Sequence, residues 1–391
     1  MTIKSIYFFF LLLPALLCDA QNALYDVIKP GHFPVGFKDT IVFDSHFQYE
    51  AFDYKGPKPH FIKIWFPVTA TPAFPQWVTV KDFFETNTSG KLATIQAELE
   101  KNFREMLIRD FIKENPATGE LNDYGNTSHD AMLGLLGAIK TNSFFYKDFT
   151  KAAFPVIVYH HGSQSFSFEN FAMAEYFASR GFIVVASGFH LPYEETVYGL
   201  KPLNRLIKNE EEHSLKTIVK FAASLTRSKS VFFIGHSWGA QMGLRSLDND
   251  TTIKAFVSLE TTIEFKTDHE KIKEFWPEVY QKLVTEKAAY PFPILFCAAT
   301  GEEKPFAFFE NVNVPEKIFV STKKEFEHNA YLSVFYLRLL LANKVNQPDK
   351  EIMQNRLALF IKHLALIETF IDGALTGKKK LKHNVHFIKD E

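Results

Sequence analysis

The sequence predicts an α/β protein built on a mostly parallel, eight-stranded sheet that is flanked by helices. Short apolar runs alternate with segments of helical period along much of the 391 residues, a pattern typical of parallel strands joined by helices. One apolar run, 230–234, leads into Gly235-His236-Ser237-Trp238-Gly239 and then into a helix-forming segment. Strand, Gly-x-Ser-x-Gly and helix in this order predict a nucleophile elbow.

The strands and helices follow from hydrophobic period and from the Gly, Pro and Asn residues between the periodic segments. The predicted strands are 40–43, 60–66, 154–160, 182–186, 230–235, 254–260, 292–299 and 317–321. The helices predicted between the later strands are 169–179, 210–225 and 241–247.

Two stretches interrupt this alternation and are interpreted as helical insertions. Residues 81–142 contain a charged amphipathic helix at 95–114 and an apolar segment at 131–139, and residues 265–290 form a second amphipathic excursion. Insertions of this kind often lie over the carboxyl ends of the strands, so we expect a partial lid.

Residues 1–20 resemble a secretory signal peptide. Lys4 precedes an apolar core at 6–17, and Cys18-Asp19-Ala20 fits a cleavage site. We therefore expect export to a periplasm or to the outside of the cell, with Gln21 as the mature start. A lipoprotein anchor at Cys18 is less favoured, because Leu17 stands where a small residue is expected.

Charge and cysteine content exclude several function classes. The net charge of −1 gives no reason to expect a nucleic-acid partner. After cleavage Cys297 is the only cysteine, which excludes a disulfide framework and a thiolate metal site within the mature chain. We expect neither a metal nor a cofactor, and the oligomeric state stays open.

A nucleophile elbow requires the glycines at both ends of this motif. The serine must sit on a tight turn, where side chains at Gly235 and Gly239 would collide with neighbouring backbone. The amide of Trp238 begins the following helix, where N–H groups favour an anion, so it is a candidate oxyanion donor. Ser237 is the candidate nucleophile.

A serine needs a base within hydrogen-bond reach and a carboxylate to orient that base. His328 lies in a polar loop after the last predicted strand and before an apolar helix beginning near Leu332, so it is the candidate base. The other downstream histidines lie in a predicted helix, in the charged tail or in the second insertion: His363, His383, His386 and His269.

Two positions compete for the acid. Glu260 ends the first strand after the elbow helix, while Glu302 and Glu303 follow the next strand. We favour Glu260, because a carboxylate that closes an apolar strand is costly unless it is paired.

The second oxyanion donor should follow the strand that ends at His160. His161-Gly162-Ser163 comes next, and Gly162 would let the backbone turn the amide of Ser163 toward the site. The adjacent pair His160 and His161 does not predict a metal site, because neighbouring side chains on a strand point to opposite faces.

With these motifs, the chain resembles the α/β-hydrolase superfamily, and most of all the platelet-activating-factor-acetylhydrolase-like and dienelactone-hydrolase-like exported serine esterases. The narrower resemblance is carried by Gly31-His32-Phe33-Pro34-Val35-Gly36-Phe37, by Ile62-Lys63-Ile64-Trp65-Phe66-Pro67 and by His161-Gly162-Ser163. It implies Ser237 as nucleophile, His328 as base and the amides of Ser163 and Trp238 as oxyanion donors. The acid position of the acetylhydrolase-like group matches Glu260, although those enzymes use Asp.

The expected activity is cleavage of carboxylic esters, short-chain or phospholipid-type, through an acyl-enzyme. The expected partner is thus a small-molecule or lipid ester. A serine peptidase or amidase would share the same residues, and a catalytically silent scaffold that binds a ligand is the alternative from another class. The basic tail 378–391, with Lys378-Lys379-Lys380-Leu381-Lys382, leaves contact with a membrane surface open.

Overall fold

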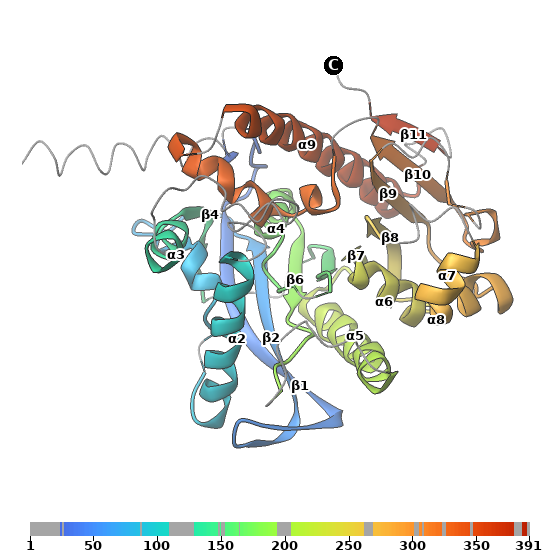
Figure 1. Ribbon diagram of the computed structural model, residues 1–391, viewed down its shortest axis with the longest axis horizontal. Helices are drawn as coiled ribbons and strands as arrows, with labels where there is room; N and C mark the ends of the chain where they lie inside the picture. Colours follow the sequence, from blue (N-terminus) through green and yellow to red (C-terminus); the bar gives the residue numbers. More distant parts are fainter. Residues whose placement is uncertain are drawn as a thin grey trace, which may run out of the picture.

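The structure is a computed structural model, drawn in Figure 1. It describes residues 24–25, 27–86, 88–108, 129–147, 149, 153–163, 165–193, 205–261, 269–300, 305–306, 309–322, 326–344, 347–378 and 385–388. The predicted signal peptide, the competing acids Glu302 and Glu303, His383 and most of the basic tail lie outside the described residues.

The described strands form one sheet in the order β11-β10-β9-β8-β7-β5-β6-β2-β1-β4-β3. Strand β2 is antiparallel to β1 and β6, and β3 is antiparallel to β4, while the other neighbouring pairs are parallel. Their bounds are β1 Val35–Ala51, β2 Tyr54–Pro67, β3 Trp77–Thr79, β4 Lys140–Phe145, β5 Val156–His160, β6 Ile183–Ser187, β7 Val231–His236, β8 Ile253–Leu259, β9 Ile294–Thr300, β10 Lys317–Thr322 and β11 Val385–Ile388.

Each of the eight predicted strands is present, but the described sheet has eleven strands, so the predicted count was too low. The three additional strands, β3, β4 and β11, lie at the two edges of the sheet. β4 begins in the last residues of the predicted insertion 81–142, and β11 falls in the basic tail 378–391, where no strand was predicted. Edge strands are short and half exposed, so they lack the continuous apolar run that reveals a central strand.

Helices cover both faces of the sheet, with α4 and α9 on one side and α5 and α6 on the other (Figure 1). The α-helices are α2 Lys91–Leu107, α3 His129–Gly137, α4 Phe171–Ala178, α5 Arg205–Leu225, α6 Trp238–Ser246, α7 His269–Phe275, α8 Pro277–Tyr280 and α9 Gln347–Thr376. The 3-10 segments are η1 Val80–Phe83, η4 Phe309–Asn311, η5 His328–Tyr331 and η6 Ser333–Lys344, and η3 Gln281–Thr285 is a π-helix.

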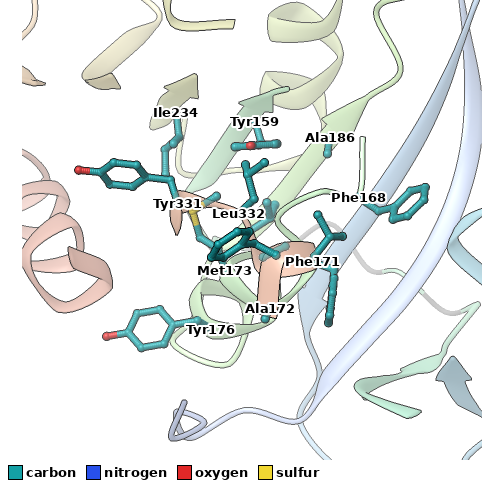
Figure 2. Packing of buried hydrophobic residues seen from close by; sticks show 14 of the residues in the cluster. Tyr159, Phe168, Phe171, Ala172, Met173, Tyr176, Ala186, Ile234, Tyr331 and Leu332 are labelled. Carbon is teal, nitrogen blue, oxygen red and sulfur yellow. The ribbon is translucent and has the colours of Figure 1, made fainter. Parts of the chain in front are cut away.

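Alternation along the central strands gives the protein two cores. In β5, Ile157 and Tyr159 enter the core beneath α4 and α9, while Val156 and Val158 enter the core beneath α5 and α6. Figure 2 shows Tyr159 and Ile234 above Met173 of α4, a packing in which each large apolar side chain contributes about 1.5–3 kcal/mol.

The chain reverses its direction across the sheet at β5. It passes from β5 to β6 on one side and returns to β7 on the other side of β5. In an open parallel sheet, ligands bind outside the carboxyl ends of the strands at such a switch point. The fold therefore directs attention to the residues that follow β5 and β7.

The first insertion contains most of η1 and all of α2 and α3, but it also contains the start of β4, so it is not purely helical. Its helix α2 packs against the rest of the protein through Ile95, Leu99 and Phe103, which are buried in the core. Within the described ranges, no helix is both long enough and apolar enough to cross a membrane. The lid role of the two insertions stays a prediction.

Candidate active site

Ser237 occupies the sharp turn between β7 and α6. Its φ of 49° and ψ of −116° lie in a region that non-glycine residues rarely adopt. The turn is held by its backbone, since the N–H of Ser237 donates to the carbonyl of Leu259 at 2.8 Å. A strained, half-buried serine between a strand and a helix has the backbone geometry of a nucleophile elbow.

The two flanking glycines are required by close backbone contacts. A Cβ on Gly235 would lie 2.5 Å from the amide nitrogen of Ala240. A Cβ on Gly239 would lie 2.3 Å from the carbonyl oxygen of His160, at the end of β5. Both neighbours are backbone atoms in the core of the fold, so neither position has room for a side chain.

His328, the predicted base, is the first residue of η5 and lies beside the elbow. Its ring centroid is 4.7 Å from that of His236, the residue before Ser237. The Nε2 of His236 lies 3.2 Å from the carbonyl oxygen of His328. A segment more than ninety positions along the chain is thus brought against the residue that precedes the serine.

The segment that carries His328 is fixed to α9. Phe326 stacks on His363 of that helix, with ring centroids 4.6 Å apart, and Glu327 pairs with Arg356 at 2.6 Å. On the far side of His328, the hydroxyl of Tyr331 donates to the carbonyl of Ala298 at 2.9 Å. The buried His363 therefore supports the segment, in agreement with its prediction as a helix residue.

Glu260, the favoured acid, directly follows β8 and is 2% exposed. Its backbone has a φ of 45°, and its N–H donates to the carbonyl of Cys297 at 2.8 Å. The Oε1 atom lies 4.0 Å from Nδ1 of His328. Because Leu259 O accepts the amide of Ser237, Glu260 is also next to the elbow in the sheet.

The environment of His328 favours the neutral imidazole that a base requires. Burial lowers its pKa below the ordinary value, and the neighbouring His236 lowers it further. The hydrogen bond and charge of Glu260 raise the pKa but do not cancel these effects. At pH 7 the ring of His328 is therefore available to accept a proton.

The loop after β5, which carries the predicted second oxyanion donor, lies against the elbow. A Cβ on Gly162 would lie 3.5 Å from Cβ of Ser237. Ser163 is exposed in this loop, and Trp238 is the first residue of α6. The structure thus brings together the segments that carry all five predicted site residues it describes.

Comparisons with known proteins bear on the fold of the chain. No protein-family model and no curated protein matches the sequence. Among solved structures, the ferulic acid esterase from Streptomyces cinnamoneus is 12% identical, covers 90% of this chain and 93% of its own, and has a TM-score of 0.54. The chain has the α/β-hydrolase fold.

Two further solved structures cover smaller parts of the chain. The monoacylglycerol lipase from Paleococcus ferrophilus is 14% identical, covers 55% of this chain and 98% of its own, and has a TM-score of 0.32. The acylaminoacyl peptidase from Pyrococcus horikoshii is 15% identical, covers 60% of this chain and 39% of its own, and has a TM-score of 0.41.

Within this α/β-hydrolase fold, Glu169 is a site residue that the sequence interpretation missed. Its buried carboxylate accepts the amide of Gly162 at 3.0 Å and the hydroxyls of Tyr159 and Ser165, and it lies 3.6 Å from Nδ1 of His236. Glu169 therefore connects the loop after β5 to the elbow. The available signal was a single carboxylate that follows Phe166-Ser167-Phe168.

Glu169 is held ionised by these contacts. Burial alone would raise its pKa, but hydrogen bonds and charge from His236, together with His161 and Ser165, lower it from 4.5 to about 2. Its interactions stabilise the folded state fully above pH 4.5, and this contribution is lost as the pH falls from 4.5 toward 2.

The adjacent histidines after β5 have separate partners. His160 Nε2 lies 3.0 Å from Glu211, while His161 Nε2 accepts the amide of Phe189 at 3.1 Å. His161 donates from Nδ1 to the carbonyl of Gly162 at 2.7 Å, and burial lowers its pKa to about 3. No group of His, Cys, Asp and Glu side chains suited to a metal ion occurs among the described residues.

Proposed function

We propose that this chain is a serine hydrolase that cleaves carboxylic esters through an acyl-enzyme intermediate. The observation that carries the proposal is the strained elbow at Ser237, beside which His328 and Glu260 approach from the ends of two other strands. A serine, a carboxylate and an imidazole in this order along the chain are the parts required for nucleophilic acyl transfer.

In this mechanism Ser237 attacks the ester carbonyl while His328 accepts its proton. Because Nδ1 of His328 faces Glu260, Nε2 is the atom that would receive the proton. The amides of Ser163 and Trp238 would stabilise the oxyanion. The imidazolium then protonates the leaving alcohol, and water attacks the acyl-enzyme by the same route.

The proposal also covers the class of substrate and the cellular location of the protein. We assign short-chain or phospholipid-type esters, the narrower likeness to platelet-activating-factor-acetylhydrolase-like exported esterases, and export after removal of residues 1–20. The same residues could attack an amide, which makes peptidase or amidase activity the second candidate. A catalytically silent binding scaffold is the other alternative, and it would neither react with a fluorophosphonate nor hydrolyse an ester.

The proposed function is tested by labelling the purified protein with a fluorophosphonate and by measuring hydrolysis of p-nitrophenyl acetate and butyrate. We expect stoichiometric labelling of the peptide that contains Ser237 and complete loss of turnover in the labelled protein, because only an activated serine reacts rapidly. Heat-unfolded protein is the control and should not be labelled. A folded protein that neither reacts nor hydrolyses would refute the proposal.

The acid is identified by comparing Glu260→Gln with the double variant Glu302→Gln/Glu303→Gln. We expect kcat to fall about 10²- to 10⁴-fold in Glu260→Gln, because an amide cannot stabilise the imidazolium. The acid limb of the kcat/KM profile should also move to lower pH, since Glu260 raises the pKa of His328. The double variant should keep the activity and the pH profile of the native protein. The reverse result would transfer the role to Glu302 or Glu303.

A further inference from the structure

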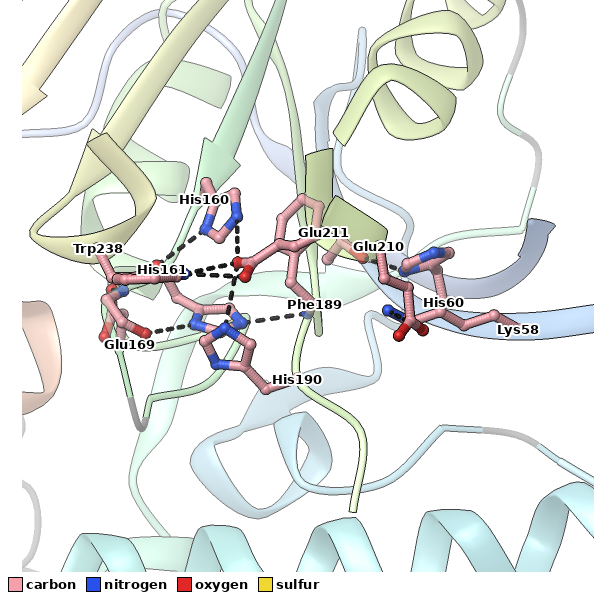
Figure 3. Close-up of polar contacts among 12 residues, drawn as sticks. Lys58, His60, His160, His161, Glu169, Phe189, His190, Glu210, Glu211 and Trp238 are labelled. Carbon is pink, nitrogen blue, oxygen red and sulfur yellow. Dashed lines mark hydrogen bonds and ion pairs between the residues drawn. The ribbon is translucent and has the colours of Figure 1, made fainter. Parts of the chain in front are cut away.

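Another buried carboxylate lies against Trp238, the residue that follows Ser237. Glu211 of α5 is 1% exposed, and three side chains surround it. Its two oxygens accept the indole N–H of Trp238 at 3.0 and 2.9 Å. Its Oε1 also lies 3.0 Å from Nε2 of His160 and 3.1 Å from Nε2 of His190 (Figure 3).

These contacts hold the carboxylate in its ionised form. Burial would raise the pKa of Glu211, but the charges and hydrogen bonds of His190 and His160 lower it well below the ordinary value. A buried anion is tolerated only when polar groups surround it, and removing it takes from the indole N–H of Trp238 its acceptor in Glu211.

Two of the residues around Glu211 belong to the segments that carry the proposed oxyanion donors. Trp238 directly follows Ser237 and supplies one amide, while His160 directly precedes the loop that reaches Ser163. The two segments also touch through backbone, because a Cβ on Gly239 would lie 2.3 Å from O of His160 and 2.7 Å from O of His161. Glu211 therefore connects, through its side-chain contacts, the start of α6 and the end of β5. These two segments must keep a fixed spacing if both amides are to bind one oxyanion.

The third partner extends the connection to the loop after β6. His190 contacts Glu211 through Nε2, and its ring lies 4.8 Å from that of His161. The preceding residue, Phe189, donates its amide to His161 and stacks flat on His160, with ring centroids 3.7 Å apart. One carboxylate thus contacts the end of β5, the loop after β6 and the start of α6.

We propose that Glu211 is a positioning residue that sets the spacing of the two oxyanion donors. This proposal rests on the proposed function, because the donors matter only if an oxyanion forms. A displacement of about 1 Å at such donors is enough to cost about 10²-fold in rate.

The test compares Glu211→Gln with the matched variant Glu210→Gln. Glu210 is the neighbouring residue and pairs instead with Lys58 of β2, at 2.9 Å. In Glu211→Gln we expect kcat for p-nitrophenyl butyrate to fall about 10- to 100-fold with KM changed less than about threefold. The affinity for a trifluoromethyl ketone, which forms a tetrahedral anion, should fall in parallel. Glu210→Gln should change neither kcat nor this affinity.

Trp238→Phe gives a second variant, which removes the indole N–H together with one ring of the side chain and leaves Glu211 in place. It should lower kcat in the same direction as Glu211→Gln, and it keeps the proposal testable if Glu211→Gln does not fold. Equal losses in Glu211→Gln and Glu210→Gln, or a change in KM alone, would overturn the positioning role.

Hydrogen exchange separates this proposal from the proposed function, because it needs no activity. In the full chain, Glu211→Gln should speed exchange in the peptides that cover 160–165 and 237–241, and Glu210→Gln should not. Unchanged exchange in both variants would refute the structural part of the proposal even in an active enzyme. Faster exchange in a protein that hydrolyses no ester would instead refute the proposed function and leave Glu211 as the residue that spaces these segments.

Discussion

Replacing Ser237 with alanine should lower ester turnover by at least about 10³-fold while the melting temperature stays the same. The reaction needs the hydroxyl oxygen of Ser237 as its nucleophile, and alanine has no such oxygen. The fold does not need that oxygen, because the turn is held by the backbone hydrogen bond from Ser237 N to Leu259 O. Rates on p-nitrophenyl acetate and butyrate, with thermal unfolding of the same samples, measure both effects.

Ser224→Ala is the matched control for this variant. Ser224 lies on the exposed side of α5, where its hydroxyl donates to the carbonyl of Phe221 at 2.6 Å. Its replacement should alter neither rate nor melting temperature. If Ser237→Ala keeps turnover within about tenfold of the native protein, the acyl-enzyme mechanism is wrong.

The sequence predicts the centre of the sheet better than its edges. Strands such as β5 and β7 are buried on both faces, so they appear as continuous apolar runs bounded by turn residues. β4, with the sequence Lys-Thr-Asn-Ser-Phe-Phe, has no such run, and it becomes a strand because it pairs with β1 and β3. β11 likewise depends on its pairing with β10.

The sequence likewise predicts some residues of the candidate site and misses others. Ser237 lies in a local motif, and His328 and Glu260 follow predicted strands, so their positions at one sheet edge follow from topology. Glu211 stands in the run Glu210-Glu211-Glu212 of an amphipathic helix. Such a run is typical of a solvated surface, and only the packing of α5 against the loops after β5 and β6 buries its middle member.

Replacing Gly239 with alanine should lower both the stability and the activity of the protein, because Gly239 is the elbow residue that packs directly against the end of β5. The new Cβ would lie 2.3 Å from O of His160 and 2.7 Å from O of His161, both backbone atoms. Relieving these contacts requires the elbow to move away from the loop that carries Ser163. We expect a loss of about 3 kcal/mol in the free energy of unfolding and a fall in kcat of at least about 10²-fold.

Gly134→Ala makes the same chemical change where the structure offers open space. Gly134 lies in α3, and a Cβ built on it meets no atom within 4 Å. Alanine is the better helix former, so this variant should be stabilised by up to about 1 kcal/mol with unchanged turnover. Denaturant unfolding and the rate of fluorophosphonate labelling distinguish the two variants. Native-like stability and labelling in Gly239→Ala would show that the elbow and the end of β5 are further apart than the structure places them. The spacing of the two proposed oxyanion donors would then also differ from that in the structure.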